Sequence, residues 1–243
     1  MPHFRSSLLG SAAARRRAAL VLILLAAAFF RFYRLDDIPP GVTHDEADTG
    51  FFVASVYRGS RVPIDVPYGH AYKPFTKYSG ALFMALFGAS DFALRLHAAF
   101  FGTLLVFVTF LWCREAVGPT TALGGSALMA ISFWPVSTSR FALNPPPALA
   151  LFTGAAYFLW RAMDPEQENR RWWAWGLFAI LLAGSLYAYE TAIAAAPLFV
   201  LYLIYLVLTD RERFRRHGGW FGAALAAAAL LAAPHLLAPS TWA

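Results

Sequence analysis

The chain has few charged residues and a single cysteine. Only 14% of its 243 residues are Asp, Glu, Lys or Arg, whereas a soluble globular domain averages about 25%. Because 59% of the residues are hydrophobic, this composition excludes an ordinary soluble enzyme and indicates a protein whose main solvent is the lipid bilayer. The lone Cys113 excludes an intrachain disulfide, and without a CxxC pattern it supports neither a redox motif nor a zinc site.

The charge that is present is mostly positive, with a net value of +6. It comes from arginines that cluster between apolar runs, which is typical of a membrane orientation signal. We therefore expect the lipid bilayer as a partner and no nucleic acid.

Apolar runs account for most of the chain and predict an all-α polytopic membrane protein with about seven transmembrane helices in one domain over residues 1–243. The first run follows three arginines, a pattern that also describes a signal peptide. Arg31 and Arg34 can snorkel from its far end and lengthen it, which favours a retained membrane anchor. The seven runs cover residues 18–33, 93–112, 120–135, 146–160, 173–189, 192–208 and 219–237.

An amino terminus inside the cell places the basic loops at Arg114, at 161–171 and at 210–216 on the cytoplasmic side, as short loops require. This arrangement predicts a multi-pass protein of the cell membrane, with residues 34–92 as a long extracytoplasmic loop. Within that loop, residues 45–58 predict a short amphipathic helix ended by Gly59. Residues 78–87 are apolar but too few to cross a bilayer, so both segments are expected to lie on the membrane surface.

The tetrapeptide Thr43-His44-Asp45-Glu46 stands out in this loop. If Thr43 caps a helix, Asp45 and Asp48 share one helical face, and such a gathering of carboxylates at the membrane surface is suited to a general base. The same letters match the Thr-x-x-Glu capping box, in which the acids serve only the helix start. Both interpretations stay open at this point.

The order and spacing of several short motifs resemble the membrane-embedded C-type glycosyltransferases, in the branch of the protein O-mannosyltransferases and the aminoarabinose transferases of lipid A. The resemblance covers nearly the whole chain. It rests on Pro39-Pro40-Gly41 before Asp45-Glu46-Ala47, on Lys73-Pro74, on Phe87-Gly88, on the block 92–96, on residues 137–140 and on residues 185–189.

The resemblance implies an enzyme that takes a sugar from a polyprenyl-phosphate donor and passes it to a protein, lipid or glycan acceptor on the extracytoplasmic face. It implies that Asp45 and Glu46 are the catalytic pair; we expect Asp45 to be the general base and Glu46 chiefly to support the loop. A leaving lipid phosphate needs fixed cations, and the family block makes Arg95 the first candidate. The alternative partner of Arg95 is Asp91, four residues earlier on the same helical face.

Four further residues are candidates for substrate binding. Lys73 matches the lysine of the Lys-Pro stretch near the donor phosphate, or is an ordinary interfacial lysine. Arg140 follows the third run near the expected donor entrance, or snorkels to headgroups. His44 orients Asp45 or touches the sugar, or is a structural part of the helix start, and Glu190 is an ionisable residue at a span's outer end.

No cofactor is required by these motifs, and a divalent metal is possible only through scattered carboxylates, since no HExxH spacing occurs. Many relatives carry a second acid after the third span, but residues 135–147 contain none. Relatives are usually longer, so the chain is expected to be incomplete at its carboxyl end. The rival hypotheses are a transporter or lipid-handling protein with a polar path through Arg95, Glu190 and His235, or a noncatalytic scaffold; a transporter predicts an internal repeat, which the sequence does not show.

Overall fold

A computed structural model describes residues 2–59, 73–164 and 172–237, and every regular element within them is a helix. Side chains are described from residue 12 onward. The helices are α1 (Pro2–Phe32), α2 (His44–Tyr57), α3 (Pro74–Phe87), α4 (Asp91–Val117), α5 (Pro119–Ile131), α6 (Phe133–Arg140), α7 (Pro145–Ala162), α8 (Trp172–Ala188), α9 (Glu190–Ala195), α10 (Pro197–Thr209) and α11 (Arg211–Leu236).

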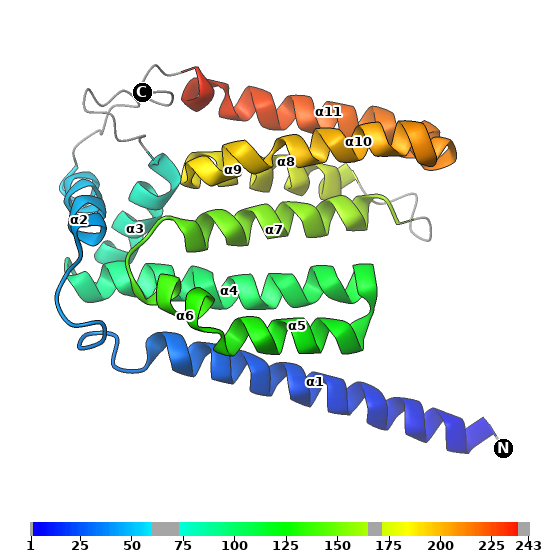
Figure 1. Ribbon diagram of the computed structural model, residues 1–243, viewed down its shortest axis with the longest axis horizontal. Coiled ribbons are helices and arrows are strands. Elements are labelled where there is room, and N and C mark those ends of the chain that lie inside the picture. The colour runs from blue at the N-terminus through cyan, green and yellow to red at the C-terminus, as the bar shows by residue number, and fades with distance from the viewer. Residues whose placement is uncertain (1, 60–72, 165–171, 238–243) are drawn as a thin grey trace.

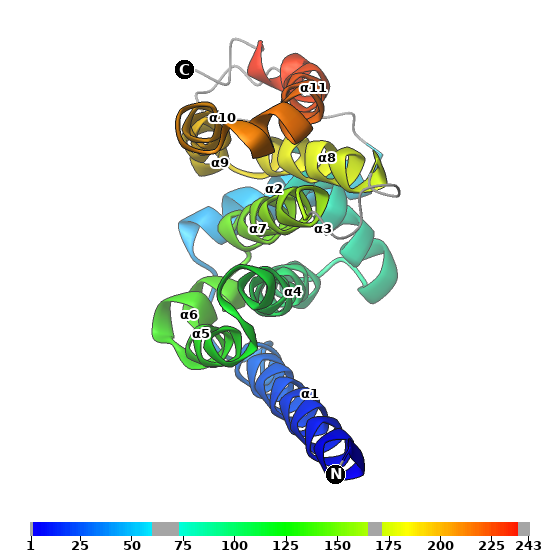
Figure 2. The same cartoon turned by 90° about the vertical axis from the view of Figure 1, so that its right-hand side faces the viewer.

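The long helices run side by side along one axis and form a stack (Figure 1). The stack begins with α1 and continues through α5, α4, α7 and α8 to α11, as the view along the helices also shows (Figure 2). Helices α2 and α3 lie together at one end of the stack, close to where α4 begins (Figure 1). We call this the α2 end.

Three helices are long and apolar enough to cross a membrane: α4, the pair α9–α10 taken together, and α11. They confirm the runs 93–112, 192–208 and 219–237 as candidate spans. Helix α8 is apolar but has only 17 residues, and α5 has 13 residues, a length of about 20 Å against an apolar core of about 30 Å. The number of seven spans stays a prediction.

The predicted run 120–135 ends early because the backbone of Ser132 is extended, and the chain then turns into the short helix α6. The predicted end of α2 at Gly59 agrees with the structure, and local residues also fix the start of α7. Pro145 opens α7, where its missing N–H has no cost, and Gly59 follows α2 with a φ of +87°, a conformation that favours glycine. Helices α2 and α3 confirm the two short helices expected between residues 34 and 92, while residues 60–72 of that loop lie outside the described ranges.

The largest buried core lies among α7, α8, α10 and α11. Phe178 is fully buried at its centre, with its ring 5.2 Å from that of Phe199 and 5.8 Å from that of Phe221. Small residues let the helices approach, since Ala155 and Ala228 are also fully or almost fully buried in this cluster.

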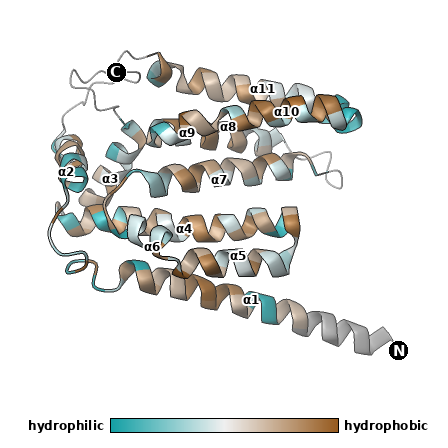
Figure 3. Ribbon diagram, viewed as in Figure 1, coloured by the Kyte–Doolittle hydropathy of each residue, from teal (hydrophilic) through white to brown (hydrophobic). Residues whose placement is uncertain are grey.

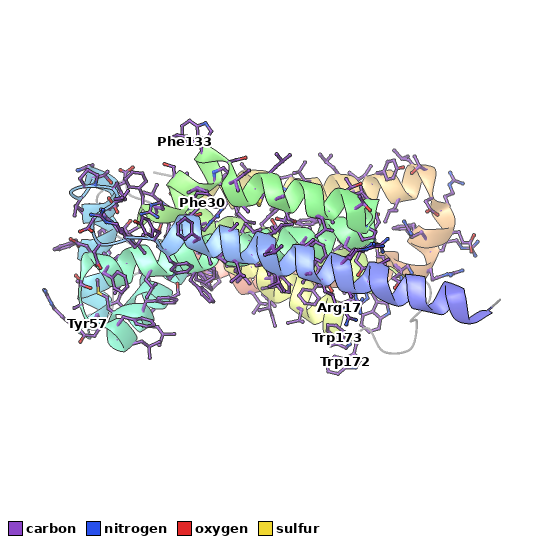
Figure 4. All side chains as sticks on the ribbon, turned by 90° about the horizontal axis from the view of Figure 1, so that it is seen from below. Arg17, Phe30, Tyr57, Phe133, Trp172 and Trp173 are labelled. Carbon is purple, nitrogen blue, oxygen red and sulfur yellow. The ribbon has the colours of Figure 1, made fainter. Side chains whose placement is uncertain are left out.

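Polar residues concentrate at the two ends of the stack and apolar ones between them (Figure 3). Trp172 and Trp173 lie with Arg17 at the end opposite to Tyr57 of α2 (Figure 4). The side chain of Trp172 is 75% exposed, which is typical of an indole at a membrane interface. The end opposite to α2 also carries turns with basic residues. Glu115, Arg161 and Arg213 line a cavity of about 280 Å³ there.

Candidate functional site

Glu46 is a buried structural acid in the first turn of α2. Its carboxylate accepts hydrogen bonds from the Thr43 backbone N–H (3.0 Å), the Thr43 hydroxyl (3.2 Å) and the backbone N–H of Ala142 (3.2 Å). The Thr43 hydroxyl in turn accepts from the Glu46 N–H at 3.3 Å, which completes a capping box and confirms that interpretation of the tetrapeptide.

Arg95 of α4 is the partner of this acid. Its Nε donates to Glu46 Oε1 at 3.0 Å, and both side chains are only 3% exposed. Burial by itself would raise the pKa of Glu46, but the bond from Arg95, together with the N–H groups of Thr43 and Ala142, outweighs it and holds that pKa below its usual value. The pair therefore stays ionised and joins α2 to α4.

The other donors of Arg95 hold the segment that precedes α2. Nη1 donates to the carbonyls of Leu35 (3.4 Å) and Pro39 (2.9 Å), and Nη2 donates to the carbonyl of Gly41 and to Glu46 Oε2 (3.4 Å). An arginine has five N–H donors, and each of these five contacts uses one. The guanidinium thus has the geometry of a buried clamp on residues 35–46.

This clamp changes the interpretation of Arg95. The expected alternative partner, Asp91, is wrong, because in the described part of the chain the carboxylate bound by Arg95 is that of Glu46. Binding of the donor by Arg95 stays a prediction. All five N–H donors of Arg95 already form bonds within the protein, so a phosphate that binds Arg95 has to displace one of them.

Arg140 and Arg31 are clamps of the same kind. Arg140 donates to the carbonyls of Phe30 (2.7 Å), Tyr33 (2.8 Å) and Ile38 (2.7 Å), so it closes the carboxyl end of α1, where a cation is favoured. Its predicted role at the donor entrance stays untested.

Arg31 is 1% exposed and donates to the carbonyls of Ala130 (3.0 Å) and Met129 (3.2 Å) at the end of α5. The expectation that it snorkels outward is wrong, because its guanidinium turns inward to these carbonyls, which have no partner within their own helix.

Asp45 differs from its neighbour Glu46. It is exposed, and Asp48 lies three residues further on the same helical face. That face is distinct from the buried face of α2, which carries Glu46, Thr49 and Val53. The capping box and a free carboxylate therefore coexist: the box uses Glu46 and leaves Asp45 open to solvent.

Two predicted residues that are distant in sequence meet at the break between α8 and α9. Lys73 Nζ lies 2.8 Å from Glu190 Oε1, and it also lies 5.1 Å from the centre of the Tyr189 ring. The backbone of Tyr189 is extended, so α8 ends at Ala188 and Glu190 begins a new helix. The hydroxyl of Thr76 reaches the Ala188 carbonyl at 3.4 Å, which ties α3 to this break.

The remaining predictions for this region are less constrained. His44 is the exposed first residue of α2, and no contact with Asp45 or with a described cation defines its role. Among the described residues, no group of three or more His, Cys, Asp or Glu side chains is arranged to hold a metal ion. Of the predicted polar path, Arg95 binds Glu46 while Glu190 binds Lys73.

The sequence analysis missed Lys77, which lies in α3 one turn after Lys73. Its side chain is 4% exposed and its ammonium lies 5.2 Å from the centre of the Phe52 ring. One signal was available: the chain has 20 basic residues, of which only Lys73 and Lys77 are lysines, at a spacing of four. The structure thus gathers Asp48, Lys73, Lys77 and Glu190 near one another, since their charges act on Lys77.

Residues 65–237 match the family model of the dolichyl-phosphate-mannose-protein mannosyltransferases. The chain belongs to this family. The matched range includes α3 to α11 and begins after the Asp45-Glu46 pair. Membership confirms the resemblance to membrane-embedded C-type glycosyltransferases.

The fold is similar to that of a solved structure, the Saccharomyces cerevisiae protein O-mannosyltransferase Pmt1-Pmt2 complex bound to the sugar donor. The TM-score is 0.72 at 17% sequence identity, over 92% of this chain and 33% of that one. The present chain therefore spans about a third of the length of this relative. No curated protein sequence matches it.

Proposed function

We propose that the protein transfers a sugar from a polyprenyl-phosphate donor to an acceptor on the extracytoplasmic face of the membrane, with Asp45 as the general base. The family is one of glycosyltransferases, and its name gives dolichyl-phosphate mannose as the donor and protein as the acceptor. For this chain we propose mannose or a related sugar and leave the acceptor as protein, lipid or glycan.

The proposal rests on the different environments of Asp45, which is exposed, and Glu46, which is buried. The Glu46 carboxylate accepts hydrogen bonds from Arg95, Thr43 and Ala142, so its oxygens already have partners within the protein. Asp45 begins the same helix, is exposed, and lies at the end of the stack that also holds Lys73 and Glu190. A base must reach the proton that it removes, and of the two acids Asp45 is the accessible one.

The proposed step is a direct displacement. Asp45 accepts the proton of the acceptor hydroxyl as the acceptor oxygen forms a bond to the anomeric carbon. The bond from the anomeric carbon to the phosphate oxygen breaks, and polyprenyl phosphate leaves with the electron pair. Fixed cations near the phosphate stabilise the charge that develops there.

Replacement of Asp45 by Asn tests the base directly. Asn keeps the shape and can still accept a hydrogen bond, but it cannot take the proton, so turnover should fall by about 10²-fold to 10⁴-fold with folding unchanged. The assay is sugar transfer by the longest available form of the protein in lipid vesicles, supplied with polyprenyl-phosphate mannose. Asp91→Asn is the matched control, because Asp91 is also an exposed acid in a first turn near the α2 end.

The capping box gives a second control. Thr43→Ala should lower the free energy of unfolding by about 1 kcal/mol, while turnover per folded molecule stays close to that of the wild type. Normal transfer by Asp45→Asn would remove Asp45 as the base and leave Asp48 as the next accessible carboxylate on that face.

A further inference from the structure

A polar cavity lies at the end of the stack opposite to α2, and the proposed reaction does not use it. Its volume is about 280 Å³. It lies where α4 and α7 end and where α10 turns into α11 (Figure 1). Two arginines and two acids line it beside aromatic rings: Arg161, Arg213, Glu115, Asp164, Trp160 and Tyr202. The cavity therefore offers cationic donors and anionic acceptors within one small space.

The arginines of this cavity are bound less tightly than the arginine clamps of α1, α4 and α6, which donate hydrogen bonds to oxygens of the fold. Arg161 Nη1 lies 3.9 Å from Glu115 Oε1, and Arg213 Nε lies 4.0 Å from Asp210 Oδ2. These separations are too long for hydrogen bonds. Both side chains are partly exposed. A guanidinium has five N–H donors, so both arginines have donors available for a ligand.

The charges of the cavity favour a ligand that carries both signs. The two arginines and the two acids that line it cancel in formal charge, so a simple anion meets repulsion from the acids and a simple cation meets repulsion from the arginines. Glu115 Oε1 accepts a hydrogen bond from Arg114 at 2.6 Å, and a carboxylate has a second oxygen that also accepts. A zwitterion can therefore place its anionic group on the arginines and its cationic group on Glu115.

The place of the cavity along the helices identifies the source of such a zwitterion. Glu115 lies in the last turn of α4 and Arg213 in the first turn of α11, and both helices are long and apolar enough to cross a membrane. Trp172 and Trp173 lie at the same end of the stack (Figure 4). Indole rings favour the level of the lipid headgroups, so the zwitterion that this cavity meets is a phospholipid headgroup.

We propose that this cavity binds a phospholipid whose headgroup carries a primary amine, with the phosphate on Arg161 and Arg213 and the ammonium on Glu115. Arginine binds phosphate through parallel N–H donors. A primary ammonium donates hydrogen bonds to a carboxylate, as a lysine does, whereas a quaternary ammonium has no hydrogen to donate. The bound lipid joins the ends of α4, α7 and α11. This site does not depend on the proposed function, because it lies at the opposite end from Asp45.

Titration with three phospholipids of identical acyl chains tests the headgroup. The longest available form of the protein, in detergent, is mixed with phosphatidylethanolamine, phosphatidylcholine or phosphatidylglycerol, and native mass spectrometry measures the bound lipid. The ethanolamine lipid should bind several-fold more tightly than the other two. Arg161→Gln should weaken its binding by about ten-fold to a hundred-fold, with partial recovery in Arg161→Lys, and Glu115→Gln should remove the preference over phosphatidylcholine. Arg215→Gln is the matched control, because Arg215 is an exposed arginine near the start of α11 that does not line the cavity.

Thermal unfolding separates loss of binding from loss of folding. Without added lipid, Arg161→Gln should have the midpoint of the wild type, because a partly exposed pair at 3.9 Å contributes little. Phosphatidylethanolamine should raise the midpoint of the wild type and not that of Arg161→Gln. Equal binding of all three lipids, wild-type binding in Arg161→Gln or an equal loss in Arg215→Gln would each overturn the proposal. Equally tight phosphatidylglycerol would overturn the amine assignment, and displacement of the lipid by an equal concentration of soluble glycerophosphoethanolamine would overturn the lipid as the source.

Discussion

The amino-terminal and carboxyl-terminal halves of the bundle are held together by different interactions. From α1 to α6, three arginines bind backbone carbonyls and one carboxylate across long sequence distances. From α7 to α11, rings and small residues pack around Phe178. Polar clamps act only in one geometry, whereas apolar packing tolerates small shifts. The half with directional bonds is also the half that carries Asp45, the proposed general base.

The largest expected effect follows from breaking the Arg95 clamp. Arg95→Met leaves Glu46 buried and ionised without its partner, and such a loss costs about 3 to 5 kcal/mol of unfolding free energy. Denaturant unfolding in a mild detergent measures it. The double variant Arg95→Met with Glu46→Gln should recover part of the loss, because the unpaired charge is gone; a double variant as unstable as the sum of both single variants would show that Arg95 acts through the carbonyls of residues 35–41 alone.

A smaller effect is expected from the apolar half. Phe178→Ala opens a cavity at the centre of the core, which in a soluble protein would cost about 3 to 5 kcal/mol. Within a bilayer the transfer term is absent, because lipid tails are as apolar as the helix interior, so we expect roughly 1 to 3 kcal/mol from lost packing. The same unfolding assay checks it. A loss equal to that of Arg95→Met would contradict the contrast between the two halves.

The smallest effect concerns pH and Lys77, a buried cation that has no ion pair among the described residues. The pKa of Lys77 is about 8 in the folded protein against 10.5 as its ordinary value, so the unfolded chain binds more protons between these values and stability should rise with pH. The gain between pH 7 and pH 9 is about 1 kcal/mol. Thermal midpoints of the wild type and Lys77→Met, which should lack this rise, test it, with Asp48, Lys73 and Glu190 as the neighbouring charges.

Much of the local structure could be predicted because it depends on nearby residues. The capping box at Thr43 and Glu46, the end of α2 at Gly59 and the start of α7 at Pro145 each follow from letters within a few positions of one another. The predicted span 120–135 was wrong at its end. Its apolar residues continue past Ser132, but the backbone turns at that residue. Composition could not locate that turn.

The partners of charged side chains could not be predicted. Helical spacing suggested Asp91 for Arg95, but the acid it binds is 49 positions away. Lys77 was passed over because a lysine in an apolar helix reads as an interfacial residue, and only packing against α2 reveals its burial.

The sequence by itself determined the class of the protein: a helical membrane chain with short helices after the first span and the motifs of a glycosyltransferase family, because these depend on composition and local spacing. Only the tertiary structure decided which charges are free. Long-range contacts engage four charged residues in bonds within the protein, namely Glu46, Arg31, Arg95 and Arg140. Asp45 stays exposed. The reason is physical: a charge can be assigned to a ligand only after the oxygens and N–H groups that fold around it are known.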